Sequence, residues 1–339
     1  MSRPLALRLE GVWYEGRAGA WVLAPLSLLF AAGAALRRQF YRLGLRRAQR
    51  MTVPVVVIGN LSVGGTGKSP LVAALAMGLR CRGRRVGVLT RGYGARLARP
   101  VRVDRDSDPA AVGDEAHMLA RDTGLPVVAS PDRVAGAREL IAQGVELILC
   151  DDGLQHYALA RDFEIVVIDA ARGFGNGRLL PAGPLRERAT RLASVDAVVV
   201  QGEPAVALAH WRGRLGRWTL QLVPEAARGV SDARRWIALE RWRGTRVHAV
   251  AGIGRPARFF AMLRAAGLEP IEHPFPDHHA FVAADLDFAD GLPVLMTAKD
   301  AVKCRAFAGD QCWEIPVVAD LQPAAGAALL DRIEALLEK

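Results

Sequence analysis

Ser62-Val63-Gly64-Gly65-Thr66-Gly67-Lys68-Ser69 follows an apolar run at Val53–Ile58 and precedes a helix-forming run at Leu71–Leu79. This order of strand, glycine-rich loop and helix is typical of a phosphate-binding P-loop. The glycines let backbone N–H groups close around a phosphate chain, and the helix N-terminus adds partial positive charge. We expect Lys68 to reach the terminal phosphates and the Ser69 hydroxyl to bind Mg²⁺. Although the usual pattern opens with glycine rather than Ser62, the flanking elements favour a nucleoside triphosphate site over a glycine-rich turn without a ligand.

Short apolar runs alternate with helix-forming segments after residue 50. The apolar runs fall at Val53–Ile58, Val86–Leu89, Val127–Ala129, Leu147–Cys150, Ile165–Ile168 and Ala197–Val200. Strands that are apolar throughout and separated by helices predict a parallel sheet covered on both faces. Right-handed crossovers would make residues 51–211 a doubly wound α/β domain of the P-loop NTPase kind.

The rest of the chain predicts a linker and a second, smaller α/β domain. Residues 212–243 are rich in tryptophan and are typical of short strands joined by turns, so we interpret them as a linker. A new alternation of strands and helices then occupies residues 244–339. Its expected elements are strands at Val247–Ala251 and Val294–Thr297 and helices at Pro256–Ala266 and Ala324–Leu337.

The N-terminal 50 residues have a composition of their own. Gly19–Leu36 carries no charged residue and is followed by six arginines: Arg37, Arg38, Arg42, Arg46, Arg47 and Arg50. We favour a helix lying in a membrane interface with its arginines on anionic head groups. A buried helix packed on the first domain remains an alternative, and a spanning segment or a cleaved signal is a weaker one.

The net charge of +10 indicates an acidic partner: nucleic acid, an anionic membrane or a phosphorylated substrate. An arginine-rich composition without functional meaning is the alternative. The basic residues are spread out without interleaved aromatic residues, which argues against nucleic acid. The four cysteines form no Cys-x-x-Cys pair, which predicts reduced thiols in a cytosolic compartment and no zinc site.

Two further segments place acids beside the predicted nucleotide site. Asp151 and Asp152 follow the apolar run Leu147–Cys150, and a strand ending in Asp is what P-loop enzymes use to hold Mg²⁺. A plain Asp-Gly turn is the alternative, and the P-loop favours the metal site. Asp114 and Glu115 open a helix-forming segment, where they would cap the helix or serve as a base or metal ligand.

A histidine and two weaker motifs lie in the second half of the chain. His278 in Asp277-His278-His279 could accept a proton from a hydroxyl during phosphoryl transfer, or be an ordinary loop histidine or a metal ligand. Gly252–Pro256 is a glycine-rich strand-to-helix turn without the full dinucleotide fingerprint. Thr297–Asp300 resembles the base-reading element of GTP-binding proteins, but its spacing is wrong, so guanine specificity does not follow.

Taken together, these segments resemble the tetraacyldisaccharide 4'-kinases, the lipid A 4'-kinases of Gram-negative bacteria. The matching segments cover most of the chain in the family's order: residues 58–70, 90–94, 113–115, Asp-Asp-Gly-Leu-Gln-His at 151–156, Leu-Pro-Ala-Gly-Pro-Leu-Arg-Glu at 180–187, 251–260, 275–279 and 297–300. The departures are Ser69, where many members have Thr, and Ala298, where many have Glu.

The resemblance implies Mg²⁺-dependent transfer of the ATP γ-phosphate to the 4'-hydroxyl of a tetraacyldisaccharide 1-phosphate, giving lipid IVA. It implies a catalytic dyad of Asp114 and His278, with Lys68 neutralising charge on the transferring group. Ser69, Asp151, Asp152 and Glu115 would hold the metal, and Arg133 and Arg186 are weaker candidates for substrate contacts.

The acylated substrate further implies a peripheral enzyme on the cytoplasmic face of the bacterial inner membrane. The expected partners are the lipid substrate and the membrane surface, with no nucleic acid and no obligate protein. A membrane-associated ATPase switch of the partitioning or targeting type is the alternative, since it shares the P-loop, the parallel sheet and a membrane-seeking helix. Such a switch would not need the histidine loop.

Overall fold

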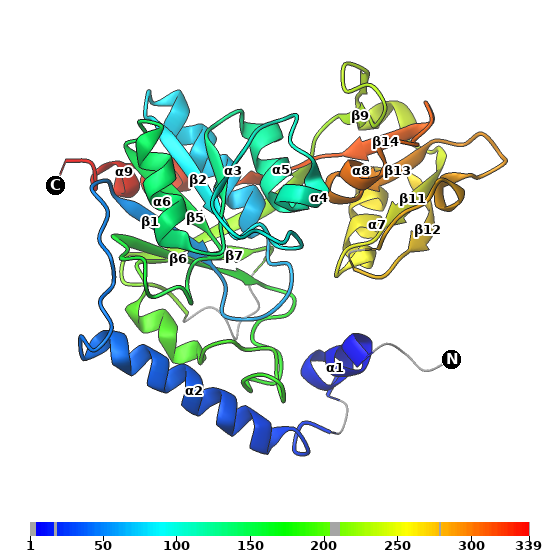
Figure 1. The fold of residues 1–339 in the computed structure, drawn as a ribbon. Helices are drawn as coiled ribbons and strands as arrows, with labels where there is room; N and C mark the ends of the chain where they lie inside the picture. Colours follow the sequence, from blue (N-terminus) through cyan, green and yellow to red (C-terminus); the bar gives the residue numbers. More distant parts are fainter. Residues whose placement is uncertain (1–4, 17–18, 204–210, 278, 339) are drawn as a thin grey trace.

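A nine-stranded sheet carries the P-loop near its centre in the computed structural model, which describes residues 5–16, 19–203, 211–277 and 279–338 (Figure 1). Its strands lie in the order β15-β8-β7-β6-β1-β5-β2-β4-β3. The parallel strands are β1 (Val55–Gly59), β2 (Val86–Thr90), β4 (Val127–Ala129), β5 (Leu147–Asp151), β6 (Phe163–Asp169), β7 (Ala197–Gln201) and β8 (Gly216–Pro224). The two edge strands, β3 (Val101–Val103) and β15 (Val317–Asp320), run antiparallel to their neighbours.

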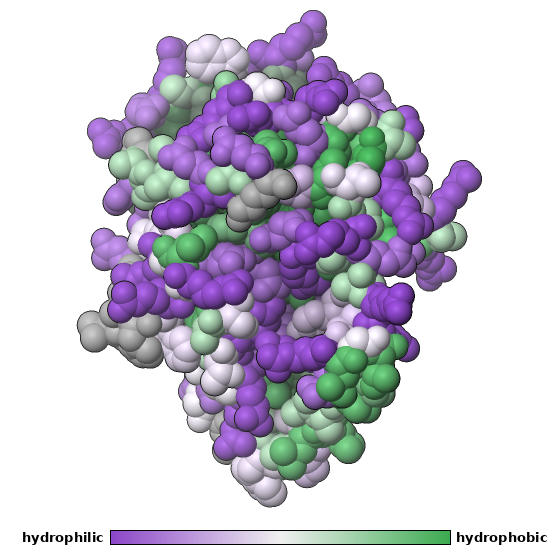
Figure 2. All heavy atoms as spheres, turned by 90° about the vertical axis from the view of Figure 1, so that its left-hand side faces the viewer, coloured by the Kyte–Doolittle hydropathy of each residue, from purple (hydrophilic) through white to green (hydrophobic). Residues whose placement is uncertain are grey.

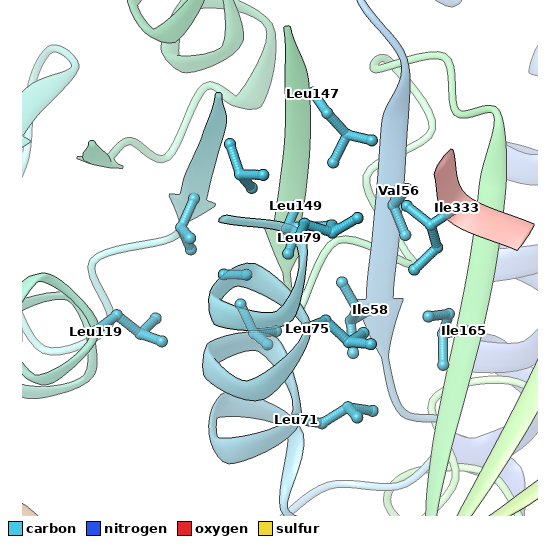
Figure 3. Close-up of a cluster of buried hydrophobic side chains, with 14 of the residues drawn as sticks. Val56, Ile58, Leu71, Leu75, Leu79, Leu119, Leu147, Leu149, Ile165 and Ile333 are labelled. Carbon is cyan, nitrogen blue, oxygen red and sulfur yellow. The ribbon is translucent and has the colours of Figure 1, made fainter. Parts of the chain in front are cut away.

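Helices cover both faces of this sheet, as the buried apolar strands require. On one face, Leu71, Leu75 and Leu79 of α3 pack on Val56 and Ile58 of β1 (Figure 3). That face also receives α5 (Asp114–Thr123) and α9 (Pro323–Glu334), whereas α6 (Arg133–Ala142) packs on the opposite face. The predicted doubly wound α/β fold is therefore confirmed. The remaining bounds are α3 (Lys68–Cys81), the short α4 (Pro109–Val112) and a 3-10 turn at Ala189–Ser194.

A second, six-stranded sheet has the order β10-β9-β14-β13-β11-β12. Its four parallel strands are β11 (Arg246–Ala251), β12 (Glu269–Pro274), β13 (Val294–Thr297) and β14 (Cys312–Ile315). Two short antiparallel strands, β9 (Ala227–Gly229) and β10 (Trp236–Ile237), extend it. Its helices are α7 (Pro256–Ala265) and α8 (Ala298–Cys304), with 3-10 turns at Leu239–Trp242 and Ala283–Leu286.

The two sheets divide the chain differently from the linker at 212–243 and the single domain at 244–339 that the sequence predicts. Strand β8 belongs to the first sheet, whereas β9 and β10 belong to the second. After β14 the chain returns, because β15 pairs with β8 and the apolar side chains Leu329 and Ile333 of α9 enter the first core. Trp218 on β8 reinforces this return by donating from Nε1 to the carbonyl of Ala325 at 3.0 Å.

The N-terminal helices α1 (Leu5–Tyr14) and α2 (Ala24–Arg42) lie outside both sheets (Figure 1). No described residue of α2 is buried, and Leu28 and Leu29 are 69% and 71% exposed. Figure 2 shows hydrophobic side chains gathered at the lower end of the molecule, where α2 lies in Figure 1. Within the described part of the chain, no helix combines the length and the apolarity that crossing a bilayer requires.

Replacing Ile333 with alanine should destabilise the P-loop unit, although the residue lies at the far end of the chain. Since Ile333 is fully buried against α3 and β1, the cavity should lower the free energy of unfolding by about 2–5 kcal/mol. Denaturant unfolding measures the change. Leu29→Ala on the exposed face of α2 serves as the control and should stay within about 0.5 kcal/mol of the wild type. An equal, small effect of both variants would contradict this placement of α9.

Candidate active site

The P-loop brings a lysine and a hydroxyl to the acids at the end of β5. The loop leaves β1 at Gly59, and α3 begins at Lys68 after Gly67, whose φ of +83° is left-handed. Ser69 donates from Oγ to Asp151 Oδ2 at 2.9 Å. The Lys68 ammonium lies 3.8 Å from Asp152 Oδ1. Lys68 and Ser69 of the P-loop therefore lie beside Asp151 and Asp152 at the carboxyl end of β5.

Asp151 is the most electrostatically perturbed carboxyl group at this edge. It is fully buried, and burial together with the nearby charge of Glu115 raises its pKa from 3.8 to about 7. One of its oxygens, Oδ1, is buried without a hydrogen-bond partner. A cation bound at this oxygen would stabilise the charged form of Asp151.

These oxygens suit Mg²⁺. The ion prefers hard oxygen ligands, keeps several waters and is held by one or two carboxylates plus substrate phosphates. Within the described residues, no three His, Cys, Asp or Glu side chains come close enough to cage an ion by themselves. A site of Asp151 and the Ser69 hydroxyl, completed by nucleotide oxygens, is consistent with that finding.

Asp152 differs from its neighbour because it is neutralised by cations. Burial would raise its pKa, but the charges of Lys68 and Arg186 outweigh burial and lower the pKa below its usual value. Arg186 donates from Nη1 to both oxygens of Asp152, at 2.9 and 3.0 Å. The backbone of Asp152 is left-handed, with φ +53°, and this conformation turns its carboxylate towards the P-loop lysine.

The segment that carries Arg186 is hydrogen-bonded to the residue just before the P-loop and to the segment that follows β5. Its backbone N–H donates to the carbonyl of Leu61 at 2.6 Å. The neighbouring Glu187 accepts hydrogen bonds from Gln155 Nε2 at 2.9 Å and from the Tyr157 hydroxyl at 2.8 Å. Gln155 and Glu187 lie within the motifs that carry the family resemblance, but the sequence alone assigned them no role. In the structure they hold Arg186 beside Asp152.

Asp114 and Glu115 begin α5 and face the second sheet's unit. Gly113 precedes them with φ +94°, and a Cβ there would lie 2.6 Å from the carbonyl oxygen of Tyr93. The carboxylate of Asp114 lies 4.0 Å from the Lys303 ammonium, and that of Glu115 lies 3.7 Å from Lys299. Both lysines come from α8, so the two units meet at these acids.

Arg133, a predicted substrate contact, is 3% exposed and donates from Nη1 to the carbonyl of Ser130 at 2.5 Å. Its positive charge contributes to the lowered pKa of Asp152. Arg133 is therefore a buried residue whose positive charge acts on the acids of the site. A direct contact with substrate stays a prediction.

The histidine loop of the second unit is described in part. His278 lies outside the described residues. Its neighbour His279 bonds through Nε2 to Asp285 at 2.9 Å. Asp277 lies beside Gly254, where a Cβ would be 3.4 Å from Asp277 Oδ2. The glycine-rich turn and the histidine loop are therefore adjacent.

Asp300 gives the segment at Thr297–Asp300 a structural role. The residue is fully buried, accepts from the Thr297 hydroxyl at 2.7 Å and accepts from the Gly252 N–H at 2.9 Å. These bonds join the start of α8 to the turn before α7. They occupy the Asp300 carboxylate, which would need to be free to bind a base.

The sequence alone does not predict that Arg172 and Gln201 lie next to the P-loop. A Cβ at Gly64 would lie 3.2 Å from Arg172 Nη1, and one at Gly67 would lie 3.1 Å from Gln201 Oε1. Gln201 in turn accepts from Arg258 of α7 at 2.6 Å. The signal that could have revealed both is positional: Arg172 follows β6 and Gln201 ends β7, and ligands bind at the carboxyl ends of parallel strands.

Comparison with known proteins agrees with this geometry. A family model described as tetraacyldisaccharide-1-P 4'-kinase matches residues 19–334. A tetraacyldisaccharide 4'-kinase of Methylobacillus flagellatus is 47% identical, covering 100% of this chain and 99% of that protein. One from Alkalilimnicola ehrlichii is 52% identical over 94% of this chain and 93% of its own length. The crystal structure of LpxK from Aquifex aeolicus in complex with ATP superposes with a TM-score of 0.77 at 27% identity, covering 94% of this chain and 99% of that one.

Replacing Asp151 with asparagine should stabilise the metal-free protein. Between pH of about 4 and 7 the unfolded chain loses this proton while the folded protein keeps it, so the stability of the wild type falls as pH rises through that range. At pH 8 the Asp151→Asn variant should gain on the order of 2 kcal/mol over the wild type, and clearly less at pH 5. Denaturant unfolding without Mg²⁺ at both pH values measures this.

The exposed Asp106 provides the matched control for that experiment. Asp106→Asn should show no such pH-dependent gain. A gain for Asp151→Asn that is the same at both pH values would contradict the assigned titration.

Proposed function

Because the chain belongs to the tetraacyldisaccharide-1-P 4'-kinase family, we propose that it transfers the γ-phosphate of ATP to the 4'-hydroxyl of a tetraacyldisaccharide 1-phosphate, giving lipid IVA. The observation that carries the proposal is the match over nearly the whole chain. The match includes the second unit. An ATPase switch of the partitioning type would not need this unit. Lipid A 4'-phosphorylation is therefore favoured over the switch.

The donor half of the reaction falls to the P-loop and the end of β5. Backbone N–H groups of the loop and the start of α3 would hold the phosphates, with Lys68 on the terminal ones. Mg²⁺, when bound, would supply positive charge that neutralises the charge on the phosphates. Ser69 and Asp151 would hold it, with Asp152 and Glu115 close by.

Asp152 has a second contribution in this scheme. It orients the Lys68 ammonium through a contact of 3.8 Å, and Arg186 balances its charge. When Lys68 turns from Asp152 to the nucleotide, Arg186 still neutralises the charge of the Asp152 carboxylate. Arg186 would meet the substrate or the phosphate at the same edge.

The acceptor half falls to Asp114 and His278. A sugar hydroxyl is a poor nucleophile, so a positioned base that takes its proton accelerates the transfer. Asp114 begins α5 beside the second unit, and it would orient His278 and stabilise its charged form. In the described structure its carboxylate lies 4.0 Å from the Lys303 ammonium of α8.

The N-terminal helices would place the enzyme on its substrate's membrane. The apolar side chains of α2 face solvent, and arginines follow them at once in the sequence. A helix of this kind lies in the interface with its apolar side chains below the head groups. We infer a peripheral enzyme on the cytoplasmic face of the inner membrane, where ATP and the lipid substrate are both present.

Purified protein with Mg²⁺-ATP should phosphorylate the tetraacyldisaccharide 1-phosphate in detergent micelles. Lys68→Ala and Asp114→Ala should each lower turnover by about 100-fold or more, because charge stabilisation or proton acceptance is lost. Mass spectrometry of the lipid product measures the rate. Arg85→Ala, which removes an arginine whose side chain is 74% exposed, is the control and should turn over normally. An ATP hydrolysis rate that does not depend on the lipid, together with the absence of a phosphorylated lipid product, would instead favour the switch.

Membrane binding should depend on the exposed face of α2. The double variant Leu28→Glu/Leu29→Glu should bind vesicles of anionic phospholipid at least about tenfold more weakly, because the apolar contact of two leucines with the lipid is lost. Vesicle co-sedimentation measures binding, and ATP binding in solution should be unchanged. Val318→Glu, on an exposed position of β15, is the matched control. Unaltered sedimentation of the double variant would remove α2 from the membrane contact.

A further inference from the structure

Arg172 lies directly on the P-loop. It belongs to the turn after β6, the strand next to β1, and this turn is fixed by the bond from the Gly173 N–H to the Asp169 carbonyl at 2.8 Å. A Cβ at Gly64 would be 3.2 Å from Arg172 Nη1, so the guanidinium occupies the space that a side chain at Gly64 would fill. With φ +103°, Gly64 is also in a conformation that favours glycine. A cation is therefore built against the loop that would wrap the phosphates.

The opposite side of this guanidinium is held by α1. Arg172 donates from Nη2 to Glu10 Oε1 at 2.8 Å, and its central carbon lies 4.6 Å from the centre of the Tyr14 ring. Glu10 and Tyr14 are four residues apart, so they share one face of α1. These contacts with α1 involve Nη2 and the flat face of the guanidinium, and Nη1 remains beside Gly64.

The position of α1 is itself fixed on the same side of the site. Trp13 donates from Nε1 to the carbonyl of Pro181 at 2.9 Å, and the Asn176 N–H donates to the carbonyl of Trp13 at 2.8 Å. Pro181 belongs to the segment that ends in Arg186 and Glu187. The N-terminal helix, Arg172 and the segment that holds Asp152 are thus one connected structure.

From this arrangement we propose that Arg172 binds the terminal phosphate of ATP, and that Glu10 and Tyr14 of α1 hold its guanidinium in place for that contact. Arginine suits the role because its planar fork of donors matches phosphate oxygens and its charge is permanent. An arginine supplied in cis beside a P-loop stabilises the charge that develops during phosphoryl transfer. Since α1 precedes the exposed helix α2, seating of the N-terminal helices is coupled to the nucleotide site.

The test compares two nucleotides in the full-length protein without lipid. Arg172→Ala should weaken binding of a non-hydrolysable ATP analogue by about 10- to 100-fold and leave ADP within about threefold, because a charged hydrogen bond to the terminal phosphate is lost. Arg172→Lys should fall between, since it keeps the charge but lacks the fork. Calorimetric titration in the presence of Mg²⁺ measures both affinities, and the retained ADP affinity reports a folded P-loop.

The contribution of α1 is tested through Glu10, which is not expected to touch the nucleotide. Glu10→Ala should weaken the ATP analogue by about three- to tenfold, whereas Glu10→Gln, whose amide oxygen still accepts from Arg172, should bind as the wild type does. Arg214→Ala is the matched control: it removes another arginine–carboxylate pair, with Asp196 at 2.8 Å, near the other end of β7, and should change neither affinity.

Each outcome decides part of the inference. An affinity of Arg172→Ala for the ATP analogue within about twofold of wild type, or an equal loss for ADP, would overturn the phosphate contact. A normal Glu10→Ala would overturn the role of α1. The inference rests on the proposed kinase function, but the readout needs no lipid. A protein that binds ATP through Arg172 and phosphorylates no lipid would therefore sink the proposed function alone.

Discussion

The hydrogen bond between Ser69 and Asp151 joins the first turn of α3 to the last residue of β5, and the arrangement of the site depends on it. It fixes the start of the P-loop helix against a buried carboxyl group in the middle of the large sheet. The sheet around this carboxyl group is apolar, so ionising it without a cation is costly. A metal ion bound beside Asp151 would stabilise the ionised form of this carboxyl group. The cationic partners of the adjacent Asp152 keep a second carboxylate charged within the same few ångströms.

The site is assembled from both units and from the N-terminal helix α1. Lysines of α8 lie against Asp114 and Glu115, Arg258 of α7 reaches the end of β7, and α1 grips Arg172. Each of these contacts joins segments that are distant in sequence. The nucleotide site is therefore in contact with the second unit and with the N-terminal helix α1.

What the sequence predicts well are the features encoded locally. The P-loop, the acids after β5 and the alternation of apolar strands with helices each depend on neighbouring residues, and the structure places them as expected. Arg172, in the turn after β6, and Gln201, at the end of β7, belong to no motif. Their place beside the P-loop follows only from the order of β7, β6 and β1 in the sheet. The return of the chain to the first sheet is likewise invisible locally, since the helix Ala324–Leu337 reads the same whichever core receives it.

That return has a consequence for how the protein is made. The second sheet's unit is inserted between β8 and β15, and the two connecting segments run side by side, with the Glu225 N–H bonded to the Pro316 carbonyl at 2.9 Å. The edge strand and the helix that complete the P-loop unit are therefore synthesised after the whole inserted unit. Until they emerge, the apolar side of α3 that receives Leu329 and Ile333 stays uncovered. A chain that is truncated before α9 would lack Leu329 and Ile333, the side chains that complete this core.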